Sequence, residues 1–213
     1  MLGRIRWGSG RKGGLRMEQI LGLSVLLVEL PQNSRRLEKK IKWAAEMLRN
    51  NHVTRVLTPP EFPWWTILIR AGLRPVETRT LRTALTPAWV VAQLERRNVF
   101  PRDAVLCLKG ERVEYDMERV ARELCPMVRN LILDIPGGYE TANRLRRELG
   151  MPILPKGFLD AHLTLQFDGG PLLTGAEVVL PYGELPTDCD KSPLIGVLWE
   201  TGRIHTEEIA LKV

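Results

Sequence analysis

The chain has 213 residues, of which 44% are hydrophobic and 26% are charged, and its formal net charge is +6. This composition fits one compact globular protein, or a main domain with an appendage, and supplies enough apolar side chains for a sizeable core. Because no stretch approaches the roughly 20 apolar residues of a membrane span, the sequence predicts no membrane partner.

The positive charge is concentrated in the first 16 residues, which contain five basic side chains and no acidic one. Without these five, 26 basic residues face 25 acidic ones, a net charge of +1. We therefore expect 1–16 to be a disordered or misannotated tail, since Lys12-Gly13-Gly14 can be encoded by a bacterial ribosome-binding sequence ahead of a start at Met17. The alternative is a basic arm that contacts nucleic acid, a partner that the near-neutral remainder does not favour.

The cysteines and histidines suggest neither a disulfide framework nor a metal site. The three cysteines form no CxxC pair, which favours a reducing, cytoplasmic compartment. The three histidines are scattered, with none at metal-ligand spacing, so we predict no metal.

Strand-like and helix-like segments alternate through most of the chain. Hydrophobic periodicity and turn residues predict strands over 20–28, 53–57, 74–78, 104–108 and 131–135. Helices are predicted between them over 34–50, 64–71, 88–97, 114–124 and 139–149. The order helix, strand, proline turn, helix occurs in 37–76 and again in 117–153, so the core is either two similar halves or two unrelated βαβ units.

This alternation predicts an α/β protein with a Rossmann-like three-layer, open, mostly parallel sheet and helices on both faces. The core spans 17–155. After Pro155 the pattern changes, and 156–213 is expected to be an antiparallel β extension. In it, 161–167 pairs with 177–180, and 195–199 with 203–205.

The most informative segment is 130–155, which has the pattern of a βαβ unit. An apolar run at 131–135 ends at Asp134-Ile135, Pro136-Gly137-Gly138 breaks it, and the following helix ends at Gly150. Asp134 at the end of a buried strand resembles a magnesium-binding acid, but no GxxxxGK(S/T) loop is present to hold a nucleotide, and a cap of the next helix is the favoured alternative.

Residues 135–142, IPGGYETA, resemble the glycine loop of shikimate/quinate dehydrogenases, whose pattern is GAGGxxxA after a strand. Gly137, Gly138 and Ala142 match by position, whereas Ile135 stands in place of the first glycine. The resemblance implies an NAD(P) cofactor, and in that family a basic residue after the next strand, here Lys156, favours a phosphorylated one. The candidate cofactor-binding residues are Asp134, Gly137, Gly138, Tyr139 and Lys156. The alternative is a tight strand–helix turn without a ligand.

The sequence thus favours a bacterial protein that binds a small ligand, either a nucleotide or a dinucleotide, as a degenerate relative of NAD(P)-dependent oxidoreductases. It leaves open whether the chain is an enzyme, and no catalytic residue can be named. In an open α/β sheet the ligand lies beyond the carboxyl ends of the strands, so loops 58–63 and 134–139 are expected to flank the site. The competing hypothesis is a non-catalytic structural or regulatory assembly protein, with no cofactor, that forms homo-oligomers.

Overall fold

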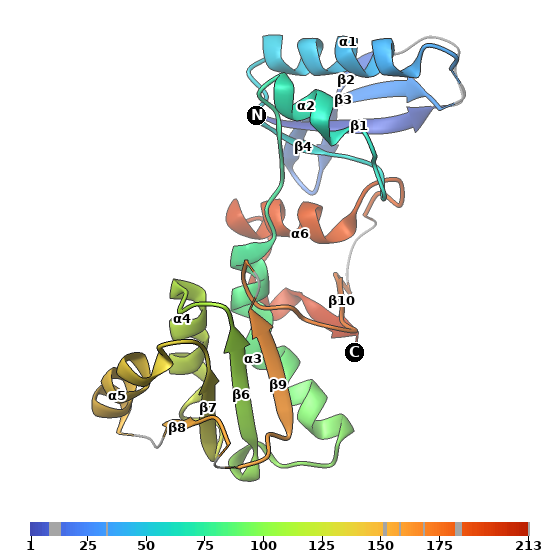
Figure 1. The fold of residues 1–213 in the computed structure, drawn as a ribbon. Helices are drawn as coiled ribbons and strands as arrows, with labels where there is room; N and C mark the ends of the chain where they lie inside the picture. Colours follow the sequence, from blue (N-terminus) through green and yellow to red (C-terminus); the bar gives the residue numbers. More distant parts are fainter. Residues whose placement is uncertain are drawn as a thin grey trace. The chain divides into compact units, whose positions relative to one another are not determined.

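The chain divides into two compact units. The structure, a computed structural model, describes residues 1–8, 14–32, 34–150, 153–157, 159–167, 169–181 and 185–212. Unit 1 comprises Met1–Thr78 and Val178–Ala210, and unit 2 comprises Arg79–Glu177 with Leu211–Val213 (Figure 1). This division differs from the expected core of 17–155 with an extension of 156–213, because the chain returns to unit 1 after leaving unit 2.

Unit 1 contains a five-stranded mixed sheet in the order β2-β3-β1-β4-β5. Its strands are β1 (Leu2–Gly8), β2 (Gly14–Ile20), β3 (Leu23–Pro31), β4 (Arg55–Leu57) and β5 (Arg74–Pro75). β1 pairs in parallel with β3 and β4, and β4 with β5, whereas β2 is antiparallel to β3.

The expectation of a disordered or extraneous tail is corrected by β1, which lies in the middle of this sheet. Its apolar Leu2 and Ile5 are buried, with 5% and 0% exposure. Arg4 is also buried, at 1% exposure, and donates to the carboxylates of Glu18 and Asp188. Arg4 and Arg6, which pairs with Glu29 at 2.8 Å, thus have acidic partners within the fold. Residues 9–13, also part of the expected tail, lie outside the described residues.

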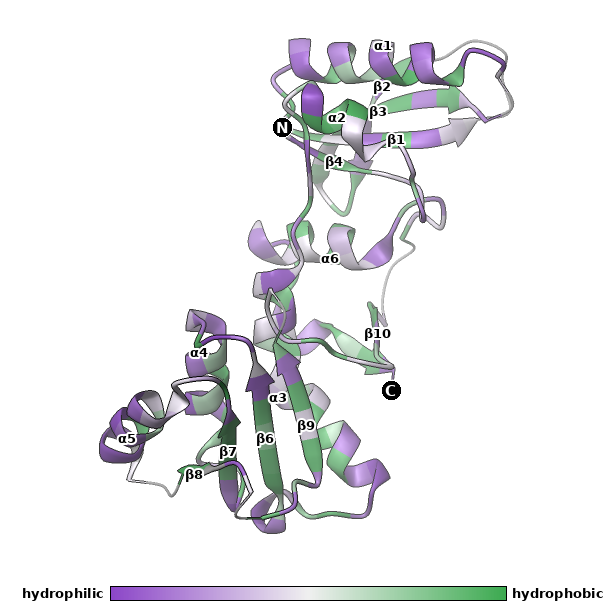
Figure 2. Ribbon diagram, viewed as in Figure 1, coloured by the Kyte–Doolittle hydropathy of each residue, from purple (hydrophilic) through white to green (hydrophobic). Residues whose placement is uncertain are grey.

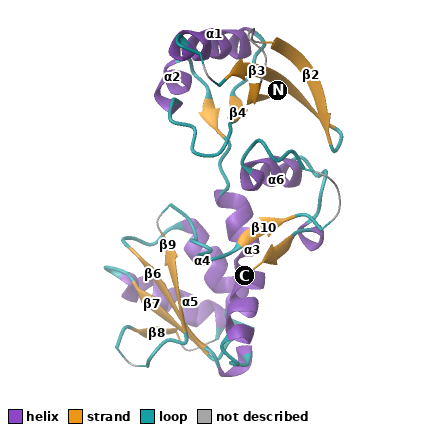
Figure 3. Cartoon of the chain, turned by 90° about the vertical axis from the view of Figure 1, so that its right-hand side faces the viewer, coloured by secondary structure: helices purple, strands orange, loops and turns teal. Residues whose placement is uncertain are grey.

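Helices cover both faces of the unit 1 sheet. Figures 1 and 3 show α1 (Leu37–Asn50) and α2 (Trp65–Arg70) on one side of it and α6 (Lys191–Glu200) on the other. The side chains of α1 that face the sheet are apolar and buried: Ile41, Ala44, Ala45 and Leu48. The expected strand at 195–199 is wrong. An apolar run of five residues fits a strand or a helix buried on all sides, and here it is the latter.

Unit 2 contains an all-parallel sheet in the order β8-β7-β6-β9. Its strands are β6 (Val105–Gly110), β7 (Asn130–Asp134), β8 (Ile153–Pro155) and β9 (Leu163–Phe167). The predicted βαβ unit at 130–155 is confirmed, with α5 (Gly138–Leu149) between β7 and β8. The expected hairpin of 161–167 with 177–180 is wrong, because β9 pairs in parallel with β6. β10 (Glu177–Val179) instead forms a two-stranded sheet with β11 (Ala210–Lys212).

One apolar cluster joins the helices of unit 2 to one face of its sheet. Leu106 and Leu108 of β6 and Leu131 and Leu133 of β7 pack with α3 (Arg79–Arg96), α4 (Tyr115–Leu124) and α5. The alternate side chains Val105, Cys107 and Ile132 form a separate small cluster. Figure 2 shows hydrophobic residues along these strands and hydrophilic ones along much of α5. The three helices of unit 2 therefore pack on the same face of its sheet. The described residues of the β8–β9 connection contain no helix that would cover the other face.

Candidate functional site

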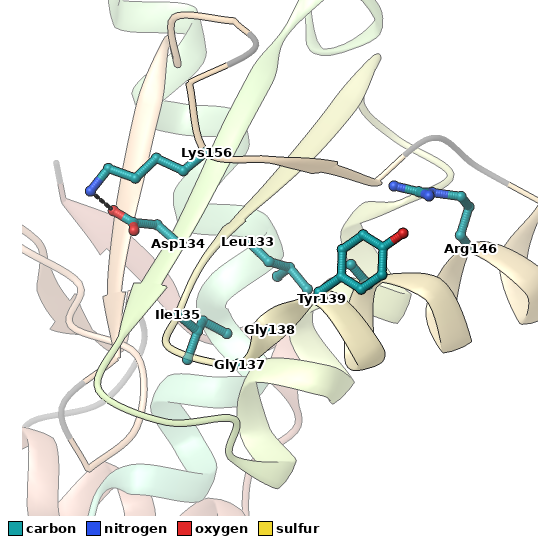
Figure 4. A pocket seen from close by; sticks show the side chains of 9 residues that line it. Leu133, Asp134, Ile135, Gly137, Gly138, Tyr139, Arg146 and Lys156 are labelled. Carbon is teal, nitrogen blue, oxygen red and sulfur yellow. Dashed lines mark ion pairs between the residues drawn. The ribbon is translucent and has the colours of Figure 1, made fainter.

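A pocket of about 300 Å³ lies at the carboxyl end of β7 in unit 2 (Figure 4). It is lined by Leu133, Asp134, Ile135, Gly137, Gly138, Tyr139, Ala142, Arg146 and Lys156. The structure therefore brings together all of the site residues that the sequence predicted, although they come from the end of β7, the start of α5 and the turn after β8. Its volume is at the lower end of the range for small-molecule sites.

The turn between β7 and α5 determines where this pocket forms. Gly137 has a left-handed backbone, with φ of 68°, which side chains other than glycine rarely adopt. The Gly138 amide donates to the Ile135 carbonyl at 3.1 Å, and α5 starts at Gly138. Gly137 is thus required to turn the chain. Gly138 has no such constraint, and a Cβ there would lie 3.4 Å from the Ile135 side chain.

Asp134 forms an ion pair with Lys156, at 2.9 Å between Oδ2 and Nζ, on the side of the pocket away from Tyr139 and Arg146 (Figure 4). The Asp134 side chain is 19% exposed and that of Lys156 is 70% exposed. The hydrogen bond to Asp134, followed by the attraction of its charge, raises the pKa of Lys156, so the ammonium stays protonated at neutral pH. Asp134 does not cap α5, because the N-cap is Gly137 and no side chain bonds there.

Arg146 is the one charged lining residue that sequence reasoning missed. Its guanidinium donates to Asn143 Oδ1 at 3.1 Å and to the carbonyl of Ile153, which fixes the arginine beside the pocket. A run of arginines such as Arg144-Arg146-Arg147 is typical of a solvated helix face, so the sequence does not single out Arg146. The available signal was spacing, because Tyr139, Ala142 and Arg146 recur at intervals that place them on one helix face.

The lining combines groups suited to a small polar ligand. One carboxylate, Asp134, accepts hydrogen bonds, and the cations Arg146 and Lys156 attract an anionic group. The Tyr139 ring, 69% exposed, offers a face on which a planar group can stack. Glu140 in the first turn of α5 opposes an anion at the helix end, so the attraction comes from the two cations rather than from the helix dipole.

Loop 58–63 does not flank this pocket, contrary to the expectation. It belongs to unit 1, where it lines a different pocket with residues of α2 and α6. The prediction assumed a single sheet, whereas the two loops follow strands of two separate sheets.

Other candidate chemistry finds little support in the described part of the chain. There, no group of three or more histidine, cysteine, aspartate or glutamate side chains is arranged to hold a metal ion. Cys107, Cys125 and Cys189 are free and buried. Burial raises the pKa of all three thiols, that of Cys189 to about 11, which makes them poor nucleophiles. None of the helices within the described ranges is long and apolar enough to cross a membrane.

Comparison with known proteins yields no relative from which a function could be transferred, since no protein-family model matches the chain and no curated sequence is significantly similar to it.

Proposed function

We propose that unit 2 binds a small nucleotide-like ligand in the pocket at the carboxyl end of β7. One observation carries this proposal. Side chains from three separate segments, selected from the sequence as ligand-binding candidates, line a single pocket there together with Arg146. Nothing in folding alone requires an acid, two cations and an exposed tyrosine to line one pocket at a strand end.

The order of the strands supports a nucleotide as the ligand. With the four strands numbered along the chain, β8-β7-β6-β9 is 3-2-1-4, the order of the first strands of a Rossmann sheet. In such sheets an acid near the end of the second strand accepts hydrogen bonds from a ribose. Asp134 is the last residue of β7, the second strand. The absence of a helix from the described part of the β8–β9 connection is the main departure from that pattern.

The charges suggest how such a ligand would lie. Asp134 would accept from the ribose hydroxyls, and Tyr139 would stack on the base. Lys156 would turn from Asp134 to a phosphate at small cost, because a pair with one partner so exposed is weak. Arg146 is held in place by Asn143 and Ile153 and would supply a fixed positive charge.

The surroundings of α4 favour a mononucleotide over a dinucleotide such as NAD(P). In a Rossmann sheet the pyrophosphate binds at the helix after the first strand, which here is α4. That helix begins with Asp116 and Glu118 in its first turn. Arg79 is already paired there, with Glu114 at 2.8 Å and with Asp116. The carboxylates oppose a pyrophosphate, and the nearby cation is engaged.

Calorimetric titration of the full chain with adenosine 5′-monophosphate tests the proposal. Tyr139→Ala should weaken binding about tenfold, because stacking of a base on an aromatic ring contributes about 1–3 kcal/mol. Tyr115→Ala is the matched control, since Tyr115 is an equally exposed tyrosine in the first turn of α4 (79% against 69%) and should leave affinity unchanged. Loss of affinity in both variants would instead indicate a ligand that reaches α4, as a dinucleotide would.

Two further comparisons separate the roles of the charged residues. Lys156→Met should lower the affinity for the monophosphate and leave the affinity for adenosine unchanged. Lys42→Met removes a similarly exposed and paired lysine in unit 1 and should change neither affinity. Asp134→Ala should abolish any preference for the monophosphate over its 2′-deoxy form. If no nucleotide binds and the protein elutes at a size that rises with concentration, the assembly hypothesis is favoured instead.

A further inference from the structure

We propose a second binding site, in unit 1, for a small ligand that carries a protonated amine beside a flat apolar group. The site is a pocket of about 290 Å³ at the carboxyl end of β4. The loop after β4, the start of α2 and the start of α6 form its walls. It is independent of the nucleotide proposal, because every residue that lines it belongs to unit 1.

One wall of the pocket is aromatic and held in place by neighbouring rings. Phe62 and Trp65 both line the pocket, with ring centroids 5.9 Å apart in an edge-to-face arrangement. Phe62 is 6% exposed and also packs against Trp64, at 5.4 Å, and Trp7, at 5.9 Å. Rings fixed in this way offer a preformed apolar surface, so a ligand that packs there does not have to order them first.

Thr58 adds a polar group to the lining of the same pocket. The residue is 7% exposed, and its backbone carbonyl accepts from the Asp190 amide at 3.3 Å. A threonine hydroxyl can donate a hydrogen bond to a polar group of a ligand or accept one from it.

The charge of the pocket selects for a cation. The carboxylates of Glu61 and Asp190 line it, and no lysine or arginine does so among the described residues. Asp190 is the N-cap residue of α6, and its exposed side chain makes no cap hydrogen bond. An ammonium group between two carboxylates and an aromatic ring is attracted by both charges and by the ring face, whereas an anion is repelled.

Three probes of similar size and different charge test the site on the full chain: phenethylamine, 2-phenylethanol and phenylacetate. Backbone and indole resonances followed by NMR report both affinity and location. We expect the amine to bind most tightly, the alcohol more weakly and phenylacetate not measurably, with shifts at Thr58 and Trp65. The proposal fails if none of the probes binds, if phenylacetate binds as well as the amine, or if the shifts fall on Tyr139 in unit 2.

Variants of the two carboxylates show whether charge is the cause. Glu61→Gln and Asp190→Asn should each lower the affinity for the amine about fivefold and leave the affinity for the alcohol unchanged. Glu46→Gln is the control, because Glu46 is an exposed glutamate on α1 that does not line the pocket. Unchanged affinity for the amine in the Glu61→Gln, Asp190→Asn double variant would overturn the proposal. Tyr139→Ala, in unit 2, should leave the affinity for the amine unchanged.

Discussion

Removal of residues 1–16 should unfold unit 1, because β1 lies between β3 and β4. Ile5 is fully buried, and deleting a buried isoleucine side chain to alanine costs about 2–5 kcal/mol. The truncation also removes Leu2, the seven paired positions with β3 and the buried Arg4 that binds Glu18 and Asp188. Because the free energy of unfolding of a domain is only about 5–15 kcal/mol, the stability lost on truncation is comparable to the total stability of the unit.

Urea unfolding followed by tryptophan emission measures this effect, since five of the six tryptophans lie in unit 1. Ile5→Ala should lower the free energy of unfolding by about 2–5 kcal/mol and Ile5→Val by about 0.5–1.5 kcal/mol. Leu15→Ala, at a 38% exposed position of the same segment, should change it by less than about 0.5 kcal/mol. A truncated chain that starts at Met17 and unfolds at the same urea concentration as the full chain would refute the placement of β1.

Three other outcomes follow from local structure. Gly137→Ala should destabilise the protein by more than about 1 kcal/mol because of its left-handed backbone, whereas Gly138→Ala should leave stability nearly unchanged in the same denaturation assay. Cys189, with its pKa raised to about 11, should react with iodoacetamide at pH 8 far more slowly in the native protein than in urea, and equal rates would contradict its burial. The hydrogen bond from Arg6 lowers the pKa of Glu29 below its ordinary 4.5. This carboxylate therefore stabilises the fold above pH 4.5, and its contribution is lost as the pH falls through the lowered pKa. Arg6→Met should reduce the dependence of the free energy of unfolding on pH in this acidic range.

The sequence predicts most of unit 2 because its signals are local. The apolar run at 131–135, the break at Pro136-Gly137-Gly138 and the stop at Gly150 lie next to one another, and together they define β7, its turn and α5. What the sequence does not show is which strands pair. β9 lies beside β6, more than 50 residues earlier in the chain, and no local pattern records that pairing.

The N-terminal strand is hard to recognise because its composition resembles that of a flexible arm. Arginine and glycine are typical of a flexible arm, but a buried arginine with two carboxylate partners is compatible with a central strand. The partners of Arg4, Glu18 and Asp188, lie 14 and 184 residues away. Neither pairing can be recognised before the fold is known.

The residues proposed for the site lie together for a local reason. Asp134, Gly137, Gly138 and Tyr139 are adjacent in sequence, and Lys156 follows the next strand, so a βαβ unit alone brings them together. The spacing of Arg146 from Tyr139 and Ala142 places it on the same face of α5, and the bond from its guanidinium to the Ile153 carbonyl, which only the structure shows, separates it from the arginines beside it.

The most direct test of the nucleotide proposal is an NMR titration of the isotopically labelled full chain with adenosine 5′-monophosphate, read at backbone amides. The proposal predicts saturable shifts concentrated at Gly137, Gly138 and Tyr139, with smaller changes near Lys156. Shifts concentrated at the start of α4, or no saturable shift at millimolar ligand, would contradict it.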